Sequence, residues 1–261
     1  MLCPHCSQEH PDNLIDCPTT GKKLKRACTN PLCSYYGEYL FPLEQDTCPC
    51  CGRSLGDTHN GHKFVDLGLS VKWATCNVGA MKPEDYGGYY QWAGTKDVSS
   101  TGIFLDERNC PYRKISGYFE DAAGWTKYNK KSIGNRTILD LHDDTANFYW
   151  GGNWRMPTDK EWKELTDNCK WKWTTYNGVK GYKITGKKPG FKNVFIFLPA
   201  AGHRSYNRLH SVSYIGAYWC SSLRKFVVSK AYNIRFNSDN YNWGENYGER
   251  WRGLSVRPVC E

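Results

Sequence analysis

The clearest helical pattern in the chain lies in residues 155–169, RMPTDKEWKELTDNC. Trp162 and Leu165 are spaced three residues apart, which places both on one face of a helix. Thr158 belongs to the residue types that cap helix N-termini, and Glu161, three positions later, completes a capping box. The pattern predicts a helix that begins after Thr158 and turns Trp162 and Leu165 toward the core.

Short apolar runs predict strands in three further places. Residues 62–80, HKFVDLGLSVKWATCNVGA, contain two such runs, broken by Gly68. The run NVFIFLPAAG (193–202) predicts a central buried strand. In the final run SVRPVC, Pro258 indicates a strand end or an edge, because proline cannot donate to a sheet ladder. A shorter helix is expected near residues 143–150.

The aromatic, glycine-rich stretch 83–94 predicts an ordered loop, and residues 95–135, which have no usable period, predict a long surface insertion. The linker between a small N-terminal module (1–56) and the main domain (62–261) is expected at residues 57–61, within a polar, turn-rich stretch.

Residues 203–252 differ in composition from the rest of the chain. They contain eleven aromatic residues, six Asn, seven Ser and six Arg, without a sustained helical period. Tyr and Trp give large contact areas at little entropic cost, while Ser and Asn give adaptable hydrogen bonds and Arg adds a flat charged face. The mixture favours a contact surface; ordinary polar loops of a β-rich domain are the alternative.

Several short segments in and beside this region have the character of fixed strands: YWCSS (218–222), AYNIRFN (231–237) and GLSVRPV (253–259). Four longer stretches contain or flank them: LPAAGHR (198–204), GAYWCSS (216–222), AYNIRFNSDNYNW (231–243) and RGLSVRPV (252–259). Together they resemble the variable proteins diversified by retroelements that rewrite a template at its adenines. Replacing the adenines of an Asn codon yields most residue types found between the fixed segments, although Lys225, Glu245 and Trp251 need another starting codon.

The resemblance implies an α+β fold, a C-type-lectin-like domain preceded by a small zinc-ribbon module. It also implies that the last strand pairs with the first strand of the domain, at residues 62–67. Trp219 and Trp243 are expected in the core, with Tyr218 facing the side opposite to Trp219. The expected ligand contacts lie between the fixed segments: His203, Ser205, Tyr206, Asn207, Arg208, His210, Ser213, Tyr214, Arg224, Phe226, Tyr241, Asn242, Glu245, Asn246, Tyr247, Glu249 and Trp251.

Eight of the thirteen cysteines fall within residues 1–51. Two short pairs separated by a strand-length spacer can place four thiolates tetrahedrally around zinc. In the second half of the module these ligands are Cys28, Cys33, Cys48 and Cys51; Cys50 could replace Cys51, but the two-residue spacing and the following glycine favour Cys51.

The first half of the module offers a less regular set. Thr20 stands where a fourth cysteine would be expected, and the best set is Cys3, Cys6, His10 and Cys17; a ribbon that has lost its metal is the alternative. A module of this size gains much of its folding energy from metal, so we expect two structural Zn²⁺ ions. A closed four-ligand site leaves no open position for catalysis, and a docking or structural role is favoured.

Net charge and hydropathy restrict the partners. The formal charge of +9 comes from residues 57–261, because residues 1–56 carry five Lys/Arg against six Asp/Glu. This diffuse excess argues against nucleic acid as the partner, since nucleic-acid binders concentrate their positive charge. No apolar run approaches membrane-spanning length and the chain begins directly on a cysteine motif, so we expect no membrane partner and a cytoplasmic location, with carriage on a virion as the alternative.

The sequence therefore predicts a non-enzymatic protein that binds a variable macromolecular ligand, with protein as the favoured class. The motif WGGNWRMPT (150–158) also resembles the superfamily of formylglycine-generating enzymes, which use a reactive cysteine pair. Cys220 and Cys260 are the candidates for such a pair, and an enzyme of this superfamily is one alternative function. A zinc-ribbon nucleic-acid binder is the other. The calcium-dependent sugar-binding triplets of C-type lectins are missing from the sequence.

Overall fold

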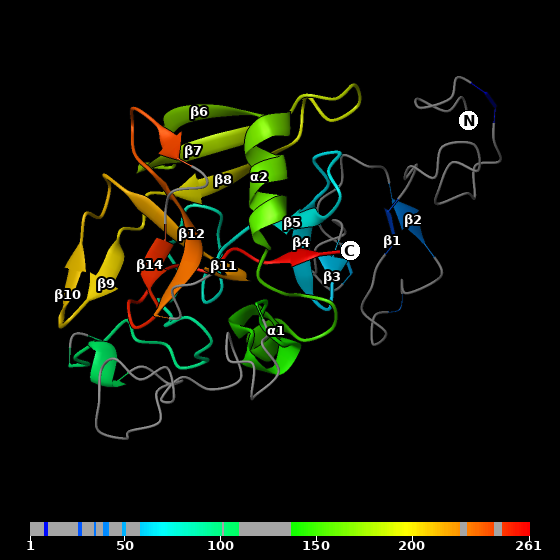
Figure 1. Cartoon of the computed structure of the whole chain (residues 1–261). Coiled ribbons are helices and arrows are strands. Elements are labelled where there is room, and N and C mark those ends of the chain that lie inside the picture. The colour runs from blue at the N-terminus through cyan, green and yellow to red at the C-terminus, as the bar shows by residue number, and fades with distance from the viewer. Residues whose placement is uncertain are drawn as a thin grey trace. The chain divides into compact units, whose positions relative to one another are not determined.

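The computed structural model of the protein describes residues 8–9, 26–27, 34, 39–41, 49–50, 58–100, 102–109, 137–224, 229–242 and 247–261. The chain forms two compact units, Met1–Thr58 and His59–Glu261. The described residues are mostly β-sheet with few helices, a sheet-rich α+β arrangement (Figure 1).

In the first unit, β1 (Arg26–Ala27) pairs antiparallel with β2 (Leu40–Phe41), and Phe41 is buried. The Oγ of Ser34 lies 3.2 Å from the Sγ of the exposed Cys50. All of the expected zinc ligands lie outside the described residues: Cys3, Cys6, His10, Cys17, Cys28, Cys33, Cys48 and Cys51.

Short strands from both ends of the second unit form one sheet in the order β15-β5-β4-β3. Its members are β3 (Thr58–His59), β4 (His62–Val65), β5 (Lys72–Ala74) and β15 (Val259–Cys260). The two strands expected on either side of Gly68 are thus present. The expected pairing of the last strand with residues 62–67 is wrong, because β15 pairs with β5, where buried Val259 lies opposite buried Trp73.

Helix α2 (Asp159–Asn168) begins where the capping box predicts. The Thr158 hydroxyl accepts a hydrogen bond from the Glu161 backbone N–H, and the Glu161 carboxylate accepts one from the Thr158 N–H at 2.7 Å. Trp162 and Leu165 are fully buried, as expected. The helix therefore follows from local sequence signals that its tertiary contacts reinforce.

A three-stranded antiparallel sheet follows α2 in the order β6-β7-β8, with β6 spanning Cys169–Tyr176, β7 Val179–Gly186 and β8 Phe195–Pro199. Strand β8 is largely buried, as expected, but it lies at one end of this order and not at its centre. Its burial comes from packing against other elements. Ile196 and Leu198 join a core cluster that also contains Trp162 and Tyr218.

The C-terminal quarter forms the remaining strands: β9 (His203–Ser205), β10 (Arg208–His210), β11 (Gly216–Leu223), β12 (Lys230–Phe236), β13 (Tyr241–Asn242) and β14 (Tyr247–Glu249). Strand β12 pairs with β11, β13 and β14, while β9 pairs with β10. Every residue of β11 is buried, and its two faces serve different clusters. Trp219 packs in one cluster and Tyr218 in another, which confirms their expected opposite orientations.

The WGGNW segment ends helix α1 (Thr145–Trp150) and holds the hairpin at the start of the second unit. Gly151 and Gly152 have φ angles of 64° and 56°, and a Cβ on Gly152 would lie 2.7 Å from the Nε2 of His59. The Trp154 indole donates to the backbone O of His59 at 2.7 Å. The glycines are thus explained by close packing, and α1 confirms the helix expected near 143–150.

Residues 83–94 form an ordered loop, as expected, and they support the C-terminal strands. The Trp92 indole donates to the O of Cys220 at 2.8 Å, and the Trp219 indole donates to the O of Tyr90 at 2.7 Å. The described part of the expected surface insertion, which includes η1 (Glu107–Asn109), is partly internal, because Val98 and Leu105 are buried in a cluster with Tyr89 and Trp251. That correction reflects contacts with distant residues that the local sequence does not encode.

Arg257 is a buried cation that joins three segments. Its Nε donates to Asn77 Oδ1 at 2.9 Å, its Nη1 to the O of Ala74 at 2.9 Å and its Nη2 to the O of Phe197 at 2.8 Å. Burial lowers the pKa of this guanidinium, and three neutral oxygens accept hydrogen bonds from its Nε and its two Nη atoms. Arg257 therefore fixes β5 and β8 relative to the C-terminal segment.

Candidate ligand-binding surface

The hairpin β9–β10 presents the most exposed group of expected contact residues. Tyr206, Asn207 and Arg208 are exposed, and Tyr206 has a φ of 52°. The backbone of Tyr206 exchanges two hydrogen bonds of 2.9 Å with Leu105. A buried residue thus holds the backbone of the hairpin tip while its side chains face solvent.

Tyr206 belongs to a group of aromatic side chains with unequal exposure. Its ring centroid lies 5.6 Å from that of Phe104, which is half exposed, and 5.2 Å from that of Trp251. Trp251 is only 5% exposed and packs with Tyr89, so its expected role as a contact residue is wrong. Trp251 fills the core beneath the hairpin. Phe104 was missed because it lies in a stretch without periodicity.

An open depression lies beside this hairpin and is lined by residues of β9, β11, β12 and β14 and of the segment that follows β14. It encloses about 370 Å³, a volume that includes open solvent at its mouth. Its lining residues are His203, Ala217, Asn233, Arg235, Gly248, Arg252 and Leu254. Of these, sequence reasoning chose only His203 as a contact.

Residues with small side chains line the floor of the depression and leave its volume unfilled. A Cβ on Gly248 would lie 2.8 Å from the Nδ2 of Asn233 and 3.1 Å from the Trp219 ring. Ala217, on β11, is buried and also lines the floor. Any larger side chain at Gly248 would displace Asn233 or Trp219, so the hollow depends on glycine at this position.

Two arginines give the lining of the depression a positive charge. Burial, followed by the nearby charges of Arg235 and Arg252 and by His210, lowers the pKa of His203 to about 4. Its imidazole is therefore neutral at pH 7 and can both donate and accept one hydrogen bond. The ring stacks on that of His210 with centroids 5.3 Å apart.

The two arginines were missed as site residues for different reasons. Arg235 is the exposed member of β12, inside a segment interpreted as scaffold. Arg252 comes directly before the fixed segment 253–259; it is half-buried and lines the depression. The strand alternation of β12, in which Ile234 and Phe236 are buried on either side of Arg235, is the signal that could have identified the first.

The other expected contacts are distributed over several places. Tyr214 is 71% exposed, whereas Ser205 is buried, which contradicts its expected contact role. Tyr241 is partly exposed but stacks on Trp171 with ring centroids 4.6 Å apart, so it also anchors β13. Glu249 forms an ion pair with Lys230, with Nζ and Oε1 3.2 Å apart.

Ser213 and Arg224 are half-buried, and the Ser213 hydroxyl lies 3.2 Å from that of Tyr86. The remaining expected contacts, or their side chains, lie outside the described residues: Phe226, Asn242, Glu245, Asn246 and Tyr247, together with the expected core residue Trp243.

The two cysteines considered for catalysis are both in the core. Cys220 is fully buried on β11, and burial, with smaller contributions from Asp159 and Glu161, raises the pKa of its thiol well above the ordinary value. Burial also raises the pKa of Cys260 to about 11. Both thiols are therefore protonated at pH 7, which is the state expected of structural cysteines.

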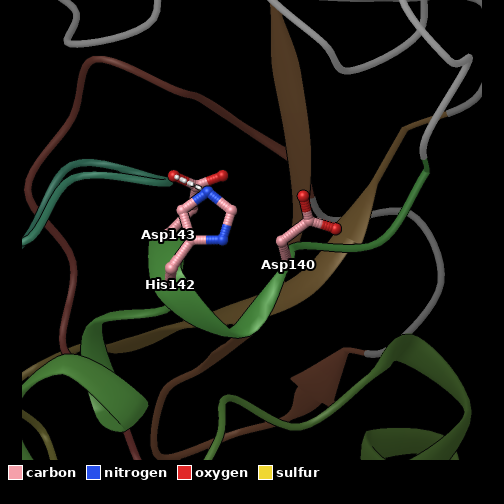
Figure 2. Close-up of side chains that lie close together, drawn as sticks. All are labelled: Asp140, His142 and Asp143. Atoms are coloured by element: carbon pink, nitrogen blue, oxygen red, sulfur yellow. Dashed lines mark ion pairs between the residues drawn. The ribbon is translucent and has the colours of Figure 1, made fainter.

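One group of potential metal ligands occurs at the turn η4 (Leu141–Asp143). Figure 2 shows Asp140, His142 and Asp143, whose ligand atoms lie within 4.8 Å of one another. The His142 Nε2 lies 3.4 Å from the Asp143 Oδ1, and His142 is largely exposed. A single 3₁₀ turn brings these side chains together, and this cluster is unrelated to the expected cysteine sites.

Among the residues that the structure describes, no helix has the length and apolar character needed to cross a membrane. In the comparisons with known proteins, no family model, no curated protein and no solved structure matches the chain.

Proposed function

We propose that the protein is a non-enzymatic binding protein that displays a diversified contact surface on a C-type-lectin-like scaffold. Residues 203–252 would be the variable region and the depression beside β9 its most enclosed part. The ligand would be a macromolecule, with protein as the favoured class. This proposal rests on the sequence resemblance together with the distribution of exposure in the C-terminal quarter.

The pattern of exposure is the observation that carries the proposal. The supposed fixed segments 218–222 and 253–259 are wholly buried, and in 231–237 only Arg235 is exposed. The exposed residues of the β9–β10 tip and Tyr214 precede the first of these segments. Side chains at such positions can change without disturbing the core, because substitutions at exposed sites usually alter stability by less than about 0.5 kcal/mol. A surface built for diversification requires this separation.

Two further observations support a binding role over the enzyme alternative. The buried, protonated states of Cys220 and Cys260 disfavour a reactive thiolate. The depression is open and lined by arginine, asparagine and histidine, without a nucleophile among its described residues.

We also propose two structural zinc sites in the N-terminal module. One would use Cys28, Cys33, Cys48 and Cys51, and the other Cys3, Cys6, His10 and Cys17. Four-ligand sets of thiolates, with or without one imidazole, suit tetrahedral zinc. Elemental analysis of the purified chain should give two zinc ions per molecule; one would leave only the all-cysteine site, and none would overturn the proposal.

DNA sequencing around the 3′ end of the gene tests the binding proposal. We expect a near-copy of the segment that encodes residues 203–259, with mismatches confined to adenines of the copy. If no copy is found, or if the mismatches involve all four bases, the diversification proposal is wrong.

A further inference from the structure

We propose that the depression beside β9 binds a carboxylate of an acidic segment of a protein ligand, held by Arg235 and Arg252. This inference rests on the proposed function, because it names the ligand chemistry of the same surface.

The charges in the depression are unbalanced. Arg235 and Arg252 both line it, and no Asp or Glu is among its described lining residues. Within the described part of the chain, neither arginine forms an ion pair. Two guanidinium groups at one hollow, without a counter-charge, give a positive potential that an anionic group would neutralise.

Arg252 is held in place while part of its donor capacity stays unused. Its guanidinium lies over the Trp251 ring, 5.5 Å from the centroid, and its backbone N–H donates to the O of Glu249 at 3.0 Å. Its Nε is buried and has no hydrogen-bond partner. A buried donor without a partner is unfavourable, so a shift of the side chain that brings this N–H to a ligand oxygen would be favoured. Because Trp251 is itself buried, the guanidinium rests against a fixed ring before any ligand arrives.

The neutral groups around the arginines suit a carboxylate. His203 has a lowered pKa and can donate one hydrogen bond without adding charge. Asn233, which is 5% exposed, places an amide in the lining. Guanidinium groups bind carboxylates through paired N–H donors, and the shallow, open form of the depression can receive a side chain that projects from a protein surface.

The surroundings favour protein over a free anion as the source of the carboxylate. The adjoining β9–β10 hairpin exposes Tyr206 and Leu209, which are 50% and 44% exposed, and Arg208. Tyrosine and arginine dominate the binding energy of protein interfaces. An acidic side chain in the depression would let its neighbours pack against the hairpin, whereas inorganic phosphate would leave these side chains unused.

The test measures binding of a fluorescent random copolymer of glutamate and tyrosine to the full-length protein, with a lysine–tyrosine copolymer as the charge-reversed probe. We expect the acidic copolymer to bind and the basic one not to bind. Arg235→Gln and Arg252→Gln should each weaken binding by at least about tenfold, as expected for loss of a charged hydrogen-bonding partner. Lys172→Gln, which removes one exposed positive charge from β6, should change it by less than about twofold.

Competition identifies the source of the anion. Inorganic phosphate or single-stranded DNA that displaces the copolymer at equal charge concentration would overturn the protein carboxylate as the ligand. Because Arg252 packs on Trp251, Arg252→Gln is interpreted only if its melting temperature is preserved; Arg235 is exposed and serves as the independent variant. Equal binding by Arg235→Gln and the wild type, or no binding by the wild type, would overturn the inference.

This outcome is separable from that of the proposed function. An adenine-restricted copy of the gene segment without arginine-dependent binding would leave a diversified protein whose depression is not a carboxylate site. Arginine-dependent binding without such a copy would establish the carboxylate site on a protein that is not diversified.

Discussion

Strand β11 and the hairpin β9–β10 lie close together in the sequence and differ completely in environment. The strand, Gly216–Leu223, is buried along its whole length, whereas Tyr206, Asn207 and Arg208 at the hairpin tip are exposed. Both contain tyrosine and serine, but the hairpin also contains arginine and histidine, whereas β11 contains glycine, alanine, tryptophan and cysteine. Their contacts differ as well: β11 lies between two core clusters, while the hairpin is held by backbone hydrogen bonds and by the buried side chain of Arg204.

This contrast explains how one region can combine a stable fold with a changeable surface. The Leu105 backbone and β9–β10 pairing fix the path of the hairpin without using the side chains at its tip. The hydrophobic free energy comes from Trp219, Tyr218 and their neighbours. Stability and recognition thus depend on different side chains of one C-terminal quarter.

The largest expected effect is a loss of stability caused by a substitution in the buried strand β11. Trp219→Ala should lower the free energy of unfolding by about 4 kcal/mol, because it empties a tryptophan-sized space and removes the indole hydrogen bond to Tyr90. Urea denaturation measures the loss, and Trp219→Phe should retain part of the stability. A loss below about 1 kcal/mol for the alanine variant would show that β11 is not a core strand.

A slightly smaller loss of stability is expected for the buried Arg257. Arg257→Met should lower the free energy of unfolding by about 3 kcal/mol, because three buried oxygens lose their hydrogen-bond donor. Arg257→Lys, which keeps the charge but cannot reach all three oxygens, should recover part of this loss. Thermal denaturation in parallel with the wild type provides the measurement; an unchanged melting temperature for Arg257→Met would contradict the structural role.

Two tyrosines with exposed side chains are expected to differ in their contribution to stability. Tyr241→Ala should lower the free energy of unfolding by about 1–2 kcal/mol because it removes the stack on Trp171. Tyr206→Asn should change stability by less than about 0.5 kcal/mol, since asparagine tolerates the left-handed backbone at this position. Differential scanning calorimetry of both variants checks the order, and the opposite order would make Tyr206 the structural residue.

The smallest expected effect is the pH dependence of stability that comes from protonation of His203. With a folded-state pKa of about 4 against an ordinary 6.5, His203 stays neutral where an unfolded chain would already bind a proton. Its contribution to stability is therefore complete above pH 6.5 and is lost as the pH falls toward 4.

NMR titration of the His203 ring should give a midpoint near pH 4. Arg235→Gln should raise this midpoint because it removes a neighbouring positive charge. Tyr206→Asn, which removes no positive charge, is the matched control. A wild-type midpoint near 6.5 would contradict the positive, partly buried depression.

The sequence predicted those structural features that depend on residues close to one another in the chain. The capping box at Thr158 and the inward face of Trp162 are local features, and both were predicted correctly. The orientation of Trp219 followed from strand alternation alone. These features depend on residues that are near one another in the chain.

Features that depend on distant contacts were missed. Trp251 is buried because Val98 and Leu105, from a stretch without periodicity, pack against it. The depression depends on Arg235 and Arg252 meeting across separate elements, which no spacing in the sequence encodes. The pairing of β15 with β5 was likewise determined by tertiary packing around Trp73.

The most direct test of the separation between scaffold and surface is a saturation library over residues 203–259, selected for resistance to proteolysis without any ligand. We predict that positions 206–208 and 214 accept most side chains, whereas positions 216–223 and 253–259 accept few. Equal intolerance at the hairpin tip and in β11 would contradict the account, because the exposed side chains would then be part of the structure that they are proposed to leave unaffected.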